Sequence, residues 1–249
     1  MSEFTGKSVL ITGASSGLGR QLAVDFAREG AKVAINYAAS EQGARETLAA
    51  VEDTGGTGLL CRADIAFKDQ VEAMVAKVAG AFGGIDILIN SAGLSIDQPL
   101  LEMTEEAFDR VLAVNLKGPF LLAQAVGRLM VAAGHGRIVN ISATTAIMAR
   151  AGNANYAASK GGLNLLTQSM ALELGPAVNV NGVALGMVDS EIVRKLFTAD
   201  EIRQSEESVP LKRLTTYEET SKFVRMLASD AAGFMTGQTV PFDGGRVMR

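Results

Sequence analysis

The chain contains little of what several large classes of protein require. Its 249 residues include one cysteine, Cys61, one histidine, His135, and no tryptophan. A single cysteine excludes an internal disulfide framework and agrees with a reducing compartment, so we expect a cytoplasmic protein. One histidine without a cluster of cysteines argues against zinc, and we expect no bound metal.

Long hydrophobic runs and clusters of basic residues are also absent from the sequence. No run of about 18 apolar residues could span a membrane, and the first residues lack the apolar core of a secretion signal. The net charge of −4 and the absence of a Lys/Arg cluster argue against binding to a nucleic-acid backbone. We therefore expect neither a membrane nor a nucleic acid among its partners.

What remains is the composition of an ordinary globule, 48% hydrophobic and 20% charged, in which apolar runs alternate with segments of helical period. The strands expected from this pattern are Ser8–Thr12, Lys32–Asn36, Gly58–Ala63, Ile85–Asn90, Arg137–Ser142, Val178–Ala184 and Gln238–Phe242. The helices expected are Gly17–Glu29, Glu41–Asp53, Lys68–Phe82, Glu105–Ala132 (as one helix or two) and Asn155–Leu174. The alternation predicts an α/β fold: one doubly wound Rossmann domain over residues 1–249, with a mostly parallel seven-stranded sheet and helices on both faces.

Residues 187–215 interrupt this alternation because they are charged and poorly periodic, although Ile192–Phe197 could form a short helix. A simple surface excursion would have the same composition. The segment follows the carboxyl end of an expected strand, however, and ligands bind at that edge in open α/β sheets. We therefore expect it to form a lid over a substrate.

A glycine-rich turn joins the first expected strand to the first expected helix. Glycines there permit a tight turn and a close approach to a dinucleotide diphosphate, which binds at the positive amino end of the helix. The spacing differs from the usual Gly-x-Gly-x-x-Gly, and a glycine turn alone is weak support. The residues expected to hold a cofactor in this turn are Gly13, Ser15, Ser16, Gly17, Leu18 and Gly19.

Tyr156 and Lys160 are four residues apart in an expected helix, which places them on one face. A neighbouring ammonium favours the phenolate, so we expect Lys160 to lower the pKa of Tyr156 from about 10 toward neutrality. Such a tyrosine can exchange a proton with an alcohol or a ketone. Beside a dinucleotide site, this pair predicts hydride transfer.

Together, the Thr-Gly-x-x-x-Gly-x-Gly turn and Tyr156-x-x-x-Lys160 resemble the short-chain dehydrogenase/reductase family, over nearly the whole chain. Asn90-Ser-Ala-Gly93 resembles its Asn-Asn-Ala-Gly signature, and residues 234–245 resemble its terminal strand. The resemblance implies that Tyr156 is the proton donor, that Lys160 holds the cofactor ribose and that Asn115 holds a water for the lysine.

The resemblance also implies a set of cofactor contacts beyond the glycine turn. The carboxylate of Asp64 is expected to accept the adenine amino group, and backbone groups of Gly186 and Val188 to reach the nicotinamide amide. The full set expected outside the turn is Tyr37, Ser40, Asp64, Ile65, Asn90, Ala92, Gly93, Tyr156, Lys160, Gly186 and Val188.

Two positions depart from the family pattern: Ala184-Leu185-Gly186 stands where the family usually has Pro-Gly, and the other departure concerns catalysis. The family's third catalytic group is a serine, and counting back from Tyr156 places Ala143 there, with Ser142 one residue earlier. A shift of one residue along a strand turns a side chain to the opposite face, so Ser142 is a catalytic residue only if the strand has ended or bulged. Thr144 and Thr145 are alternatives. A compensating hydroxyl, a substrate that needs no such donor, and an engineered or weakly active chain all remain open.

The cofactor choice depends on the end of the second expected strand, where an acidic residue would bind the ribose of NAD. Tyr37 occupies that position, and the next acidic residue is Glu41. Ser40 and Arg45 are the candidate partners of a 2′-phosphate. NADPH is therefore favoured over NADH.

The overall pattern looks most like 3-oxoacyl-carrier-protein reductases and polyketide ketoreductases. The expected activity is reduction of a ketone in a 3-oxoacyl thioester or a polyketide, including aromatic polyketides of the angucycline type, either carrier-bound or free. Two alternatives remain: a family member that binds dinucleotide without turnover, which Ala143 favours, and a simple phosphate binder, which the Tyr156–Lys160 pair contradicts. The resemblance also implies a homodimer or homotetramer formed through Glu105–Ala132 and Asn155–Leu174.

Overall fold

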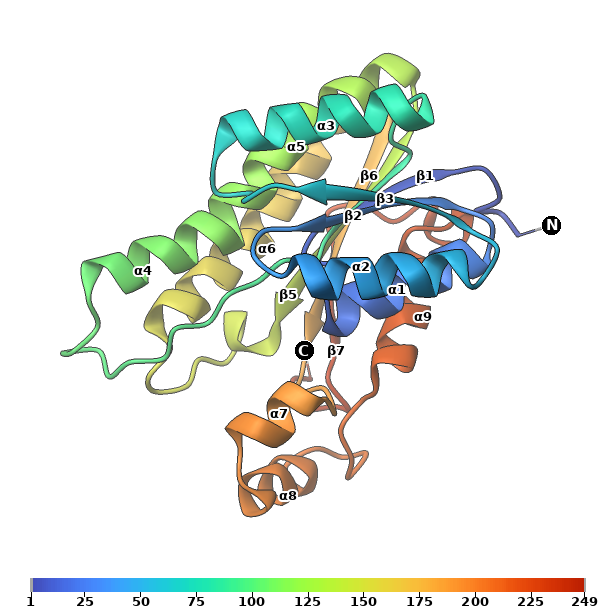
Figure 1. Ribbon diagram of the computed structural model, residues 1–249. Coiled ribbons are helices and arrows are strands. Elements are labelled where there is room, and N and C mark those ends of the chain that lie inside the picture. Colours follow the sequence, from blue (N-terminus) through green and yellow to red (C-terminus); the bar gives the residue numbers. More distant parts are fainter. Residues whose placement is uncertain (1, 249) are drawn as a thin grey trace.

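A seven-stranded sheet in the order β3-β2-β1-β4-β5-β6-β7 forms the centre of the computed structural model, which describes residues 2–248 (Figure 1). The strands are β1 (Ser8–Ile11), β2 (Lys32–Tyr37), β3 (Thr57–Arg62), β4 (Ile87–Asn90), β5 (Gly136–Ala143), β6 (Val178–Leu185) and β7 (Thr239–Phe242). All neighbouring strands pair in parallel. The predicted Rossmann-like sheet is therefore confirmed, and it is parallel throughout.

Helices cover both faces of this sheet (Figure 1). They are α1 (Gly17–Arg28), α2 (Glu41–Glu52), α3 (Lys68–Phe82), α4 (Glu105–Leu112), α5 (Gly118–Ala133), α6 (Ala154–Leu174), α7 (Glu191–Leu196), α8 (Ala199–Glu207) and α9 (Tyr217–Leu227). One hydrophobic core joins the sheet to α1, α2 and α9, and a second joins its other face to α3, α5 and α6. Since both faces are buried, the strands consist of nearly continuous apolar runs.

Two helices were not predicted from the sequence, α8 and α9. Each begins with a capping box, Thr198 with Glu201 in α8 and Thr216 with Glu219 in α9. That Thr-x-x-Glu spacing is a recognised start signal for a helix and was available in the sequence. The segment expected as one or two helices over 105–132 contains α4 and α5 with a π-helical turn, Ala113–Lys117, between them.

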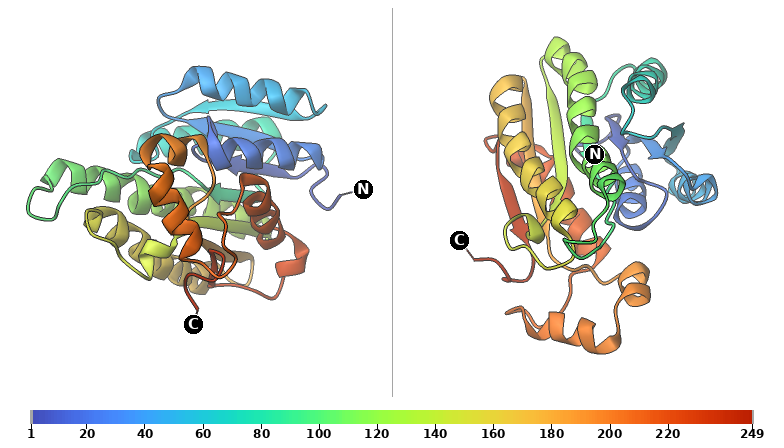
Figure 2. Two further views of the ribbon diagram at one scale, coloured as in Figure 1. Left: turned by 90° about the horizontal axis from the view of Figure 1, so that it is seen from below. Right: turned by 90° about the vertical axis from the view of Figure 1, so that its left-hand side faces the viewer.

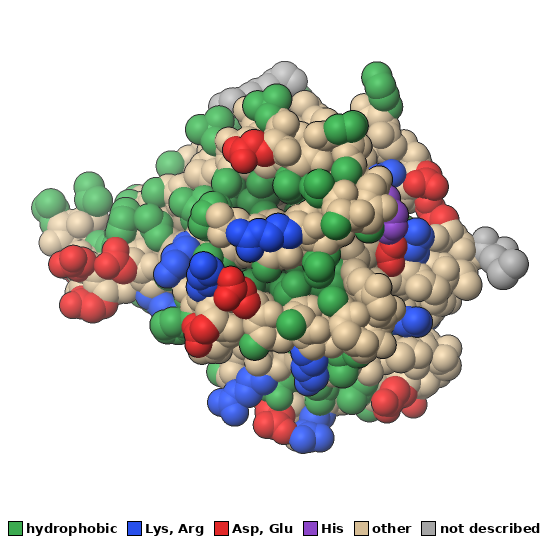
Figure 3. Space-filling model, turned by 90° about the horizontal axis from the view of Figure 1, so that it is seen from above, with side chains coloured by type: hydrophobic (Ala, Val, Ile, Leu, Met, Phe, Trp, Pro, Cys, Tyr) green, Lys and Arg blue, Asp and Glu red, His purple; other side chains and the backbone are tan. Residues whose placement is uncertain are grey.

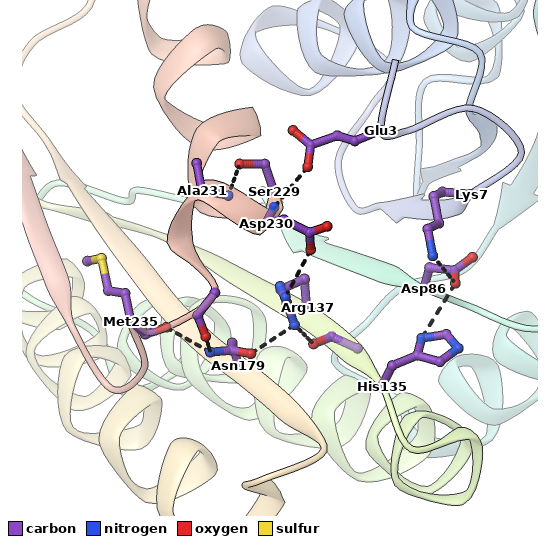
Figure 4. Close-up of polar contacts among 12 residues, drawn as sticks. Glu3, Lys7, Asp86, His135, Arg137, Asn179, Ser229, Asp230, Ala231 and Met235 are labelled. Carbon is purple, nitrogen blue, oxygen red and sulfur yellow. Dashed lines mark hydrogen bonds and ion pairs between the residues drawn. The ribbon is translucent and has the colours of Figure 1, made fainter. Parts of the chain in front are cut away.

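Polar contacts around Asp86 close the amino edge of the sheet (Figure 4). The backbone amide and the hydroxyl of Ser8 donate to its carboxylate at 2.8 and 2.9 Å. Lys7 and His135 approach the same carboxylate at 3.5 and 3.6 Å. Burial opposes ionisation of Asp86, but the Ser8 hydrogen bonds, together with Lys7 and His135, outweigh it and hold the pKa of Asp86 below its usual value.

Arg137, at the start of β5, completes this edge (Figure 4). Its guanidinium donates to Asn179 Oδ1 at 2.8 Å and approaches Asp230 at 3.4 Å. The backbone amide of Asp230 in turn donates to Glu3 at 2.9 Å. The charged groups drawn at this edge thus have partners within the chain.

The opposite edge, where the strands end, carries the sequence motifs. Helices α7 and α8 stand away from the sheet on this side, at the bottom of Figure 1 and in the right-hand view of Figure 2. Across residues 2–248 no helix is long and apolar enough to cross a bilayer.

Candidate active site

The glycine-rich turn connects β1 to α1 at the carboxyl edge. Gly13 and Gly17 have φ of +65° and +56°, the left-handed region that favours glycine. A Cβ atom on Gly13 would lie 2.8 Å from Cα of Ala92, in the turn after β4. A Cβ atom on Gly19 would lie 2.5 Å from the carbonyl oxygen of Gly13. The conformation and packing of this turn therefore require all three glycines.

The start of α1 offers backbone amides that no side chain caps. Its N-cap residue, Ser16, is extended and makes no capping hydrogen bond among the described residues. By contrast, Thr104, Thr198 and Thr216 cap α4, α8 and α9. An uncapped helix start attracts an anion through its free N–H groups and its dipole, so this end of α1 suits the diphosphate of a dinucleotide.

Arg20 and Asn36 hold the turn in place, and sequence reasoning missed both. The guanidinium of Arg20 donates to the carbonyl oxygens of Ser15 and Gly43 at 2.9 and 3.1 Å. The amide of Gly13 donates to Asn36 Oδ1 at 3.3 Å. Both residues act through contacts that only the folded chain creates, so no spacing in the sequence identified them.

The end of β2 differs from what the sequence led us to expect of Tyr37. It is 7% exposed and packs in the core, and its carbonyl oxygen accepts from the amide of Ala63 at 2.9 Å. Ser40 is exposed and caps α2 by accepting from the amide of Gly43 at 3.2 Å. Arg45 donates to Glu41 at 2.6 Å. A 2′-phosphate would therefore meet Ser40 directly and Arg45 only in exchange for Glu41.

Asp64 follows β3 with both carboxylate oxygens engaged. One accepts from the amide of Ala66 at 3.0 Å, and the other from the guanidinium of Arg110 on α4 at 2.8 Å. Ile65 is buried in the core beside it. The carboxylate expected to meet the adenine amino group is thus fixed in orientation by Arg110, a residue that the sequence motifs did not reveal.

The last residue of β4 carries an unpaired buried acceptor. Asn90 Nδ2 donates to Asn140 Oδ1 at 2.7 Å, whereas Asn90 Oδ1 is buried and meets no partner in residues 2–248. A buried acceptor without a partner is costly and calls for a functional explanation. Thr12 Oγ1 accepts from the amide of Ala92 at 3.0 Å and so holds the turn after β4 beside the glycine-rich turn.

Tyr156, Lys160 and Asn115 come together from α6 and the π-helical turn. Lys160 Nζ lies 5.7 Å from the centroid of the Tyr156 ring and donates to the carbonyl oxygen of Ile141 at 2.7 Å. A Cβ atom on Gly93 would lie 3.7 Å from Lys160 Nζ and 3.8 Å from Asn115 Oδ1. The structure thus brings the expected catalytic lysine and asparagine to the end of the Asn90–Gly93 motif.

The side chain of Asn115 holds the loop that begins after this motif. Its Oδ1 accepts from the amide of Leu94 at 2.8 Å, and its Nδ2 donates to the Leu94 carbonyl oxygen at 2.8 Å. Nδ2 also donates to Ser159 Oγ, one residue before Lys160, at 3.1 Å. Short π-helical segments are frequent at functional sites, and this one aims Asn115 between the loop and α6.

Burial dominates the ionisation of the tyrosine and the lysine. Removal from water raises the pKa of Tyr156 to about 12, which Arg150 opposes and Asp97 reinforces. Burial also lowers the pKa of Lys160 to about 8. The prediction that Lys160 lowers the tyrosine pKa toward neutrality is therefore wrong for this structure, because desolvation of the phenol outweighs the charges around it.

Ser142 does not occupy the position of a catalytic serine. Strand β5 continues to Ala143, and Ser142 Oγ donates to Asn164 Oδ1 on α6 at 2.6 Å. The strand neither ends nor bulges before Ala143, which was the condition for Ser142 to substitute. Its hydroxyl is consequently turned onto α6. Thr145 Oγ1, one of the alternatives, is buried and unpaired among the described residues.

Two loops close over Tyr156. Asp97, in the loop after β4, forms an ion pair with Arg150, in the loop before α6. The amide of Gln98 donates to the carbonyl oxygen of Gly152 at 2.8 Å and joins the same loops. Both charges of the ion pair act on the ionisation of the phenol, so the pair borders the reacting group. Sequence reasoning missed this pair as well.

Gly186 and Val188 begin the segment expected as a lid. The amide of Gly186 donates to the carbonyl oxygen of Phe242 at 3.2 Å. Val188 pairs with Thr215, whose carbonyl oxygen accepts from the amide of Asp189 at 2.8 Å. The two ends of the segment therefore lie side by side at the carboxyl edge of the sheet. Helices α7 and α8 lie between these paired ends (Figure 2).

These groups fit a dinucleotide: an uncapped helix start, two left-handed glycines and an unpaired buried acceptor meet at one edge of the sheet. Within the described part of the chain, no group of three or more His, Cys, Asp or Glu is arranged to hold a metal ion.

Comparisons with known proteins agree with this geometry. Residues 13–246 match the family model described as Enoyl-(Acyl carrier protein) reductase. The chain is 38% identical over 244 residues to the 3-oxoacyl-[acyl-carrier-protein] reductase FabG of Staphylococcus epidermidis, covering 97% of this chain and 99% of the relative.

Solved structures of similar proteins share the fold. A short-chain type dehydrogenase/reductase from Mycobacterium marinum superposes with a TM-score of 0.92 at 35% identity, covering 99% of this chain and 97% of the other. A gluconate 5-dehydrogenase from Burkholderia cenocepacia, in complex with NADP and tartrate, gives 0.91 at 34% identity, covering 97% and 95%.

Proposed function

The chain belongs to the short-chain dehydrogenase/reductase family and is an oxidoreductase, and we propose that it reduces a ketone to a secondary alcohol with NADPH. The observation that carries this proposal is the meeting of Tyr156, Lys160 and Asn115 at the edge where the glycine-rich turn leaves α1 uncapped. A proton donor and a dinucleotide site at one edge are the parts that a ketoreductase needs.

In this proposal NADPH, when bound, supplies the hydride. Tyr156 donates the proton of its hydroxyl to the substrate oxygen as charge develops there. Because burial raises the pKa of Tyr156 to about 12, the phenol holds its proton at neutral pH, which is the form that proton donation to a ketone requires. Lys160, held by the Ile141 carbonyl and with a pKa of about 8, can return a proton to the phenol at neutral pH.

The preference for NADPH over NADH rests on the end of β2. No carboxylate stands at Tyr37, and the next one along the chain, Glu41, is engaged by Arg45 at 2.6 Å. Ser40 is exposed at the start of α2, where a 2′-phosphate would meet its hydroxyl. The similar gluconate 5-dehydrogenase was solved with NADP. Kinetics with NADPH and NADH, compared as kcat/KM, test this part alone.

For the substrate we propose a 3-oxoacyl thioester or a polyketide ketone, since the Staphylococcus epidermidis relative is named for a carrier-bound 3-oxoacyl group. The cations of the lid are matched by neighbouring carboxylates: Arg194 with Asp189 at 2.8 Å, and Arg203 with Asp200 at 3.0 Å. This pairing weakens the attraction of an acidic carrier. A free thioester or an aromatic polyketide of the angucycline type therefore suits the lid at least as well.

We also propose that the chain forms a homodimer or homotetramer through α4, α5 and α6. Leu165 and Leu172 on α6 are 66% and 85% exposed, and Phe108 on α4 and Phe120 on α5 are exposed as well. Figure 3 shows hydrophobic side chains gathered at the end of the molecule where α4 lies, at its left. Burial of such side chains in a symmetric interface would remove them from water. Light scattering tests the oligomeric state.

The activity itself is tested by following the absorbance of NADPH with two ketones. One is acetoacetyl-CoA, which is a short-chain 3-oxoacyl thioester, and the other is a bicyclic ketone. Consumption of NADPH with either of them supports the proposal. One observation favours a second candidate, a protein that binds dinucleotide without turnover: Ala143 stands at the serine position and Ser142 is turned onto α6. Tight binding of NADPH without turnover of any ketone would favour that candidate.

A further inference from the structure

A tyrosine outside the family motifs lies against the glycine-rich turn. Tyr217 is the first residue of α9, and its hydroxyl oxygen lies 3.1 Å from the position of a Cβ atom on Gly17. Gly17 is the first residue of α1, whose start no described side chain caps. The Tyr217 hydroxyl therefore stands beside the free amides that the proposed function assigns to a diphosphate.

The groups that lie at this point each carry a hydrogen-bond donor. The Tyr217 side chain is half-buried, and its hydroxyl makes no hydrogen bond to any residue from 2 to 248. The amides of Gly17 and Leu18 are donors too, because they begin a helix. The amides can only donate and the phenol can donate as well, so a phosphate oxygen that accepts from both would satisfy them together, and its charge strengthens such hydrogen bonds.

The backbone of Tyr217 is held firmly in this position. Thr216 caps α9 by accepting from the amide of Glu219 at 3.2 Å, and Glu219 accepts from the amide of Thr216 at 3.1 Å. Arg213 donates to both oxygens of Glu219 at 2.7 Å. Thr215 pairs with Val188 at the base of the lid. A donor that is already positioned loses little conformational freedom on binding, which favours affinity.

We propose that the Tyr217 hydroxyl donates a hydrogen bond to the diphosphate of the bound dinucleotide, and that Tyr217 is thus an additional cofactor-binding residue. This inference rests on the proposed function. An oxygen that accepts from an amide lies about 2.9 Å from its nitrogen, so a phosphate on the first amides of α1 comes within reach of a hydroxyl beside Gly17.

The test is the variant Tyr217→Phe, which removes the hydroxyl and keeps the ring. Titration calorimetry should show that the variant binds NADPH about 10-fold more weakly, the loss expected for one hydrogen bond to a charged acceptor. NADH should lose the same factor because it carries the same diphosphate. Adenosine 2′-monophosphate, which has the adenosine and the 2′-phosphate but no phosphate at the 5′ position, should bind both proteins equally. The KM for NADPH should rise more than kcat falls.

A matched control is Tyr37→Phe, which removes the same atom from a tyrosine packed in the core at the end of β2. It should change the affinities for NADPH and for adenosine 2′-monophosphate by one common factor. The inference is overturned if Tyr217→Phe binds NADPH as tightly as the wild type, or if both ligands weaken equally in that variant. If the wild type binds neither NADPH nor NADH, the proposed function itself fails, and this inference fails with it.

Discussion

The polar groups named at the two edges of the sheet differ in whether they have partners within the chain. At the amino edge, the charges around Asp86 and Arg137 meet partners within the chain (Figure 4). At the carboxyl edge, the start of α1, Asn90 Oδ1 and the Tyr217 hydroxyl have no partner among the described residues. Of these, Asn90 Oδ1 is buried, and a buried acceptor without a partner costs stability, so a ligand is expected near it.

The largest effect at the carboxyl edge is expected from Lys160→Met, which removes a buried charge with little change of volume. We expect kcat to fall about 1000-fold, because the proton donor loses its relay. Binding of NADPH should weaken too, since the lysine is expected to hold its ribose. Steady-state kinetics and calorimetry on one preparation measure both. A variant that keeps wild-type kcat would remove Lys160 from the mechanism.

The next effect should come from Ala143→Ser, which restores a hydroxyl at the position where the family has one. We expect kcat to rise about 10- to 100-fold, by analogy with positioned donors that stabilise a developing oxyanion, while the Kd of NADPH stays the same. Single-turnover rates with saturating NADPH provide the measurement. An unchanged rate would show that another group, with Thr145 the first to examine, already serves the substrate oxygen.

The pH dependence of the reaction should reflect Lys160 rather than Tyr156. Burial lowers the pKa of Lys160 to about 8, so its charge is present below that pH and is lost as the pH rises through it. Tyr156, with a pKa raised to about 12, keeps its proton across the same range. We expect kcat/KM to be level below about pH 8 and to fall above it. A fall that begins near pH 6 would contradict these assignments.

The smallest effect is expected at the amino edge, from Asp86→Asn. Loss of the charge that Ser8, Lys7 and His135 satisfy should reduce the free energy of unfolding by about 1 to 2 kcal/mol, with no change in kcat. The pKa of Asp86 is lowered by folding from its usual 3.8, so its contribution is present above that pH and is lost as the pH falls through the lower folded value.

Denaturation of the wild type and Asp86→Asn at several pH values measures this contribution. The difference between them should be constant near neutral pH and disappear under strongly acidic conditions. A large loss of kcat in Asp86→Asn would show that the two edges are not independent. It would contradict the assignment of stability to the amino edge and of catalysis to the carboxyl edge.

Most of the fold was predictable because apolar strands and amphipathic helices alternate so regularly. The helices α8 and α9 were missed although their capping boxes, Thr198 with Glu201 and Thr216 with Glu219, are visible in the sequence. Their surroundings are charged and the hydrophobic period is weak, so the start signals stood without the usual support. The sheet could be predicted because its strands have a clear hydrophobic period. The two missed helices could have been predicted only from the capping residues at their starts.

The candidate site was predictable as a set of positions but not as a set of environments. The motifs placed Tyr156, Lys160 and the glycine-rich turn at one edge, because the carboxyl ends of parallel strands meet there. They could not give the pKa of Tyr156, which depends on the loops carrying Asp97 and Arg150. Nor could they reveal Tyr217, whose contact with Gly17 joins residues that are far apart in the chain.

The most direct test of the account is the effect of Tyr156→Phe on turnover and on NADPH binding, measured on the same preparation. The account predicts that kcat falls about 1000-fold, because the proton donor is gone, and that the Kd of NADPH changes little. A Tyr156→Phe variant that reduces the ketone at the wild-type rate would contradict it.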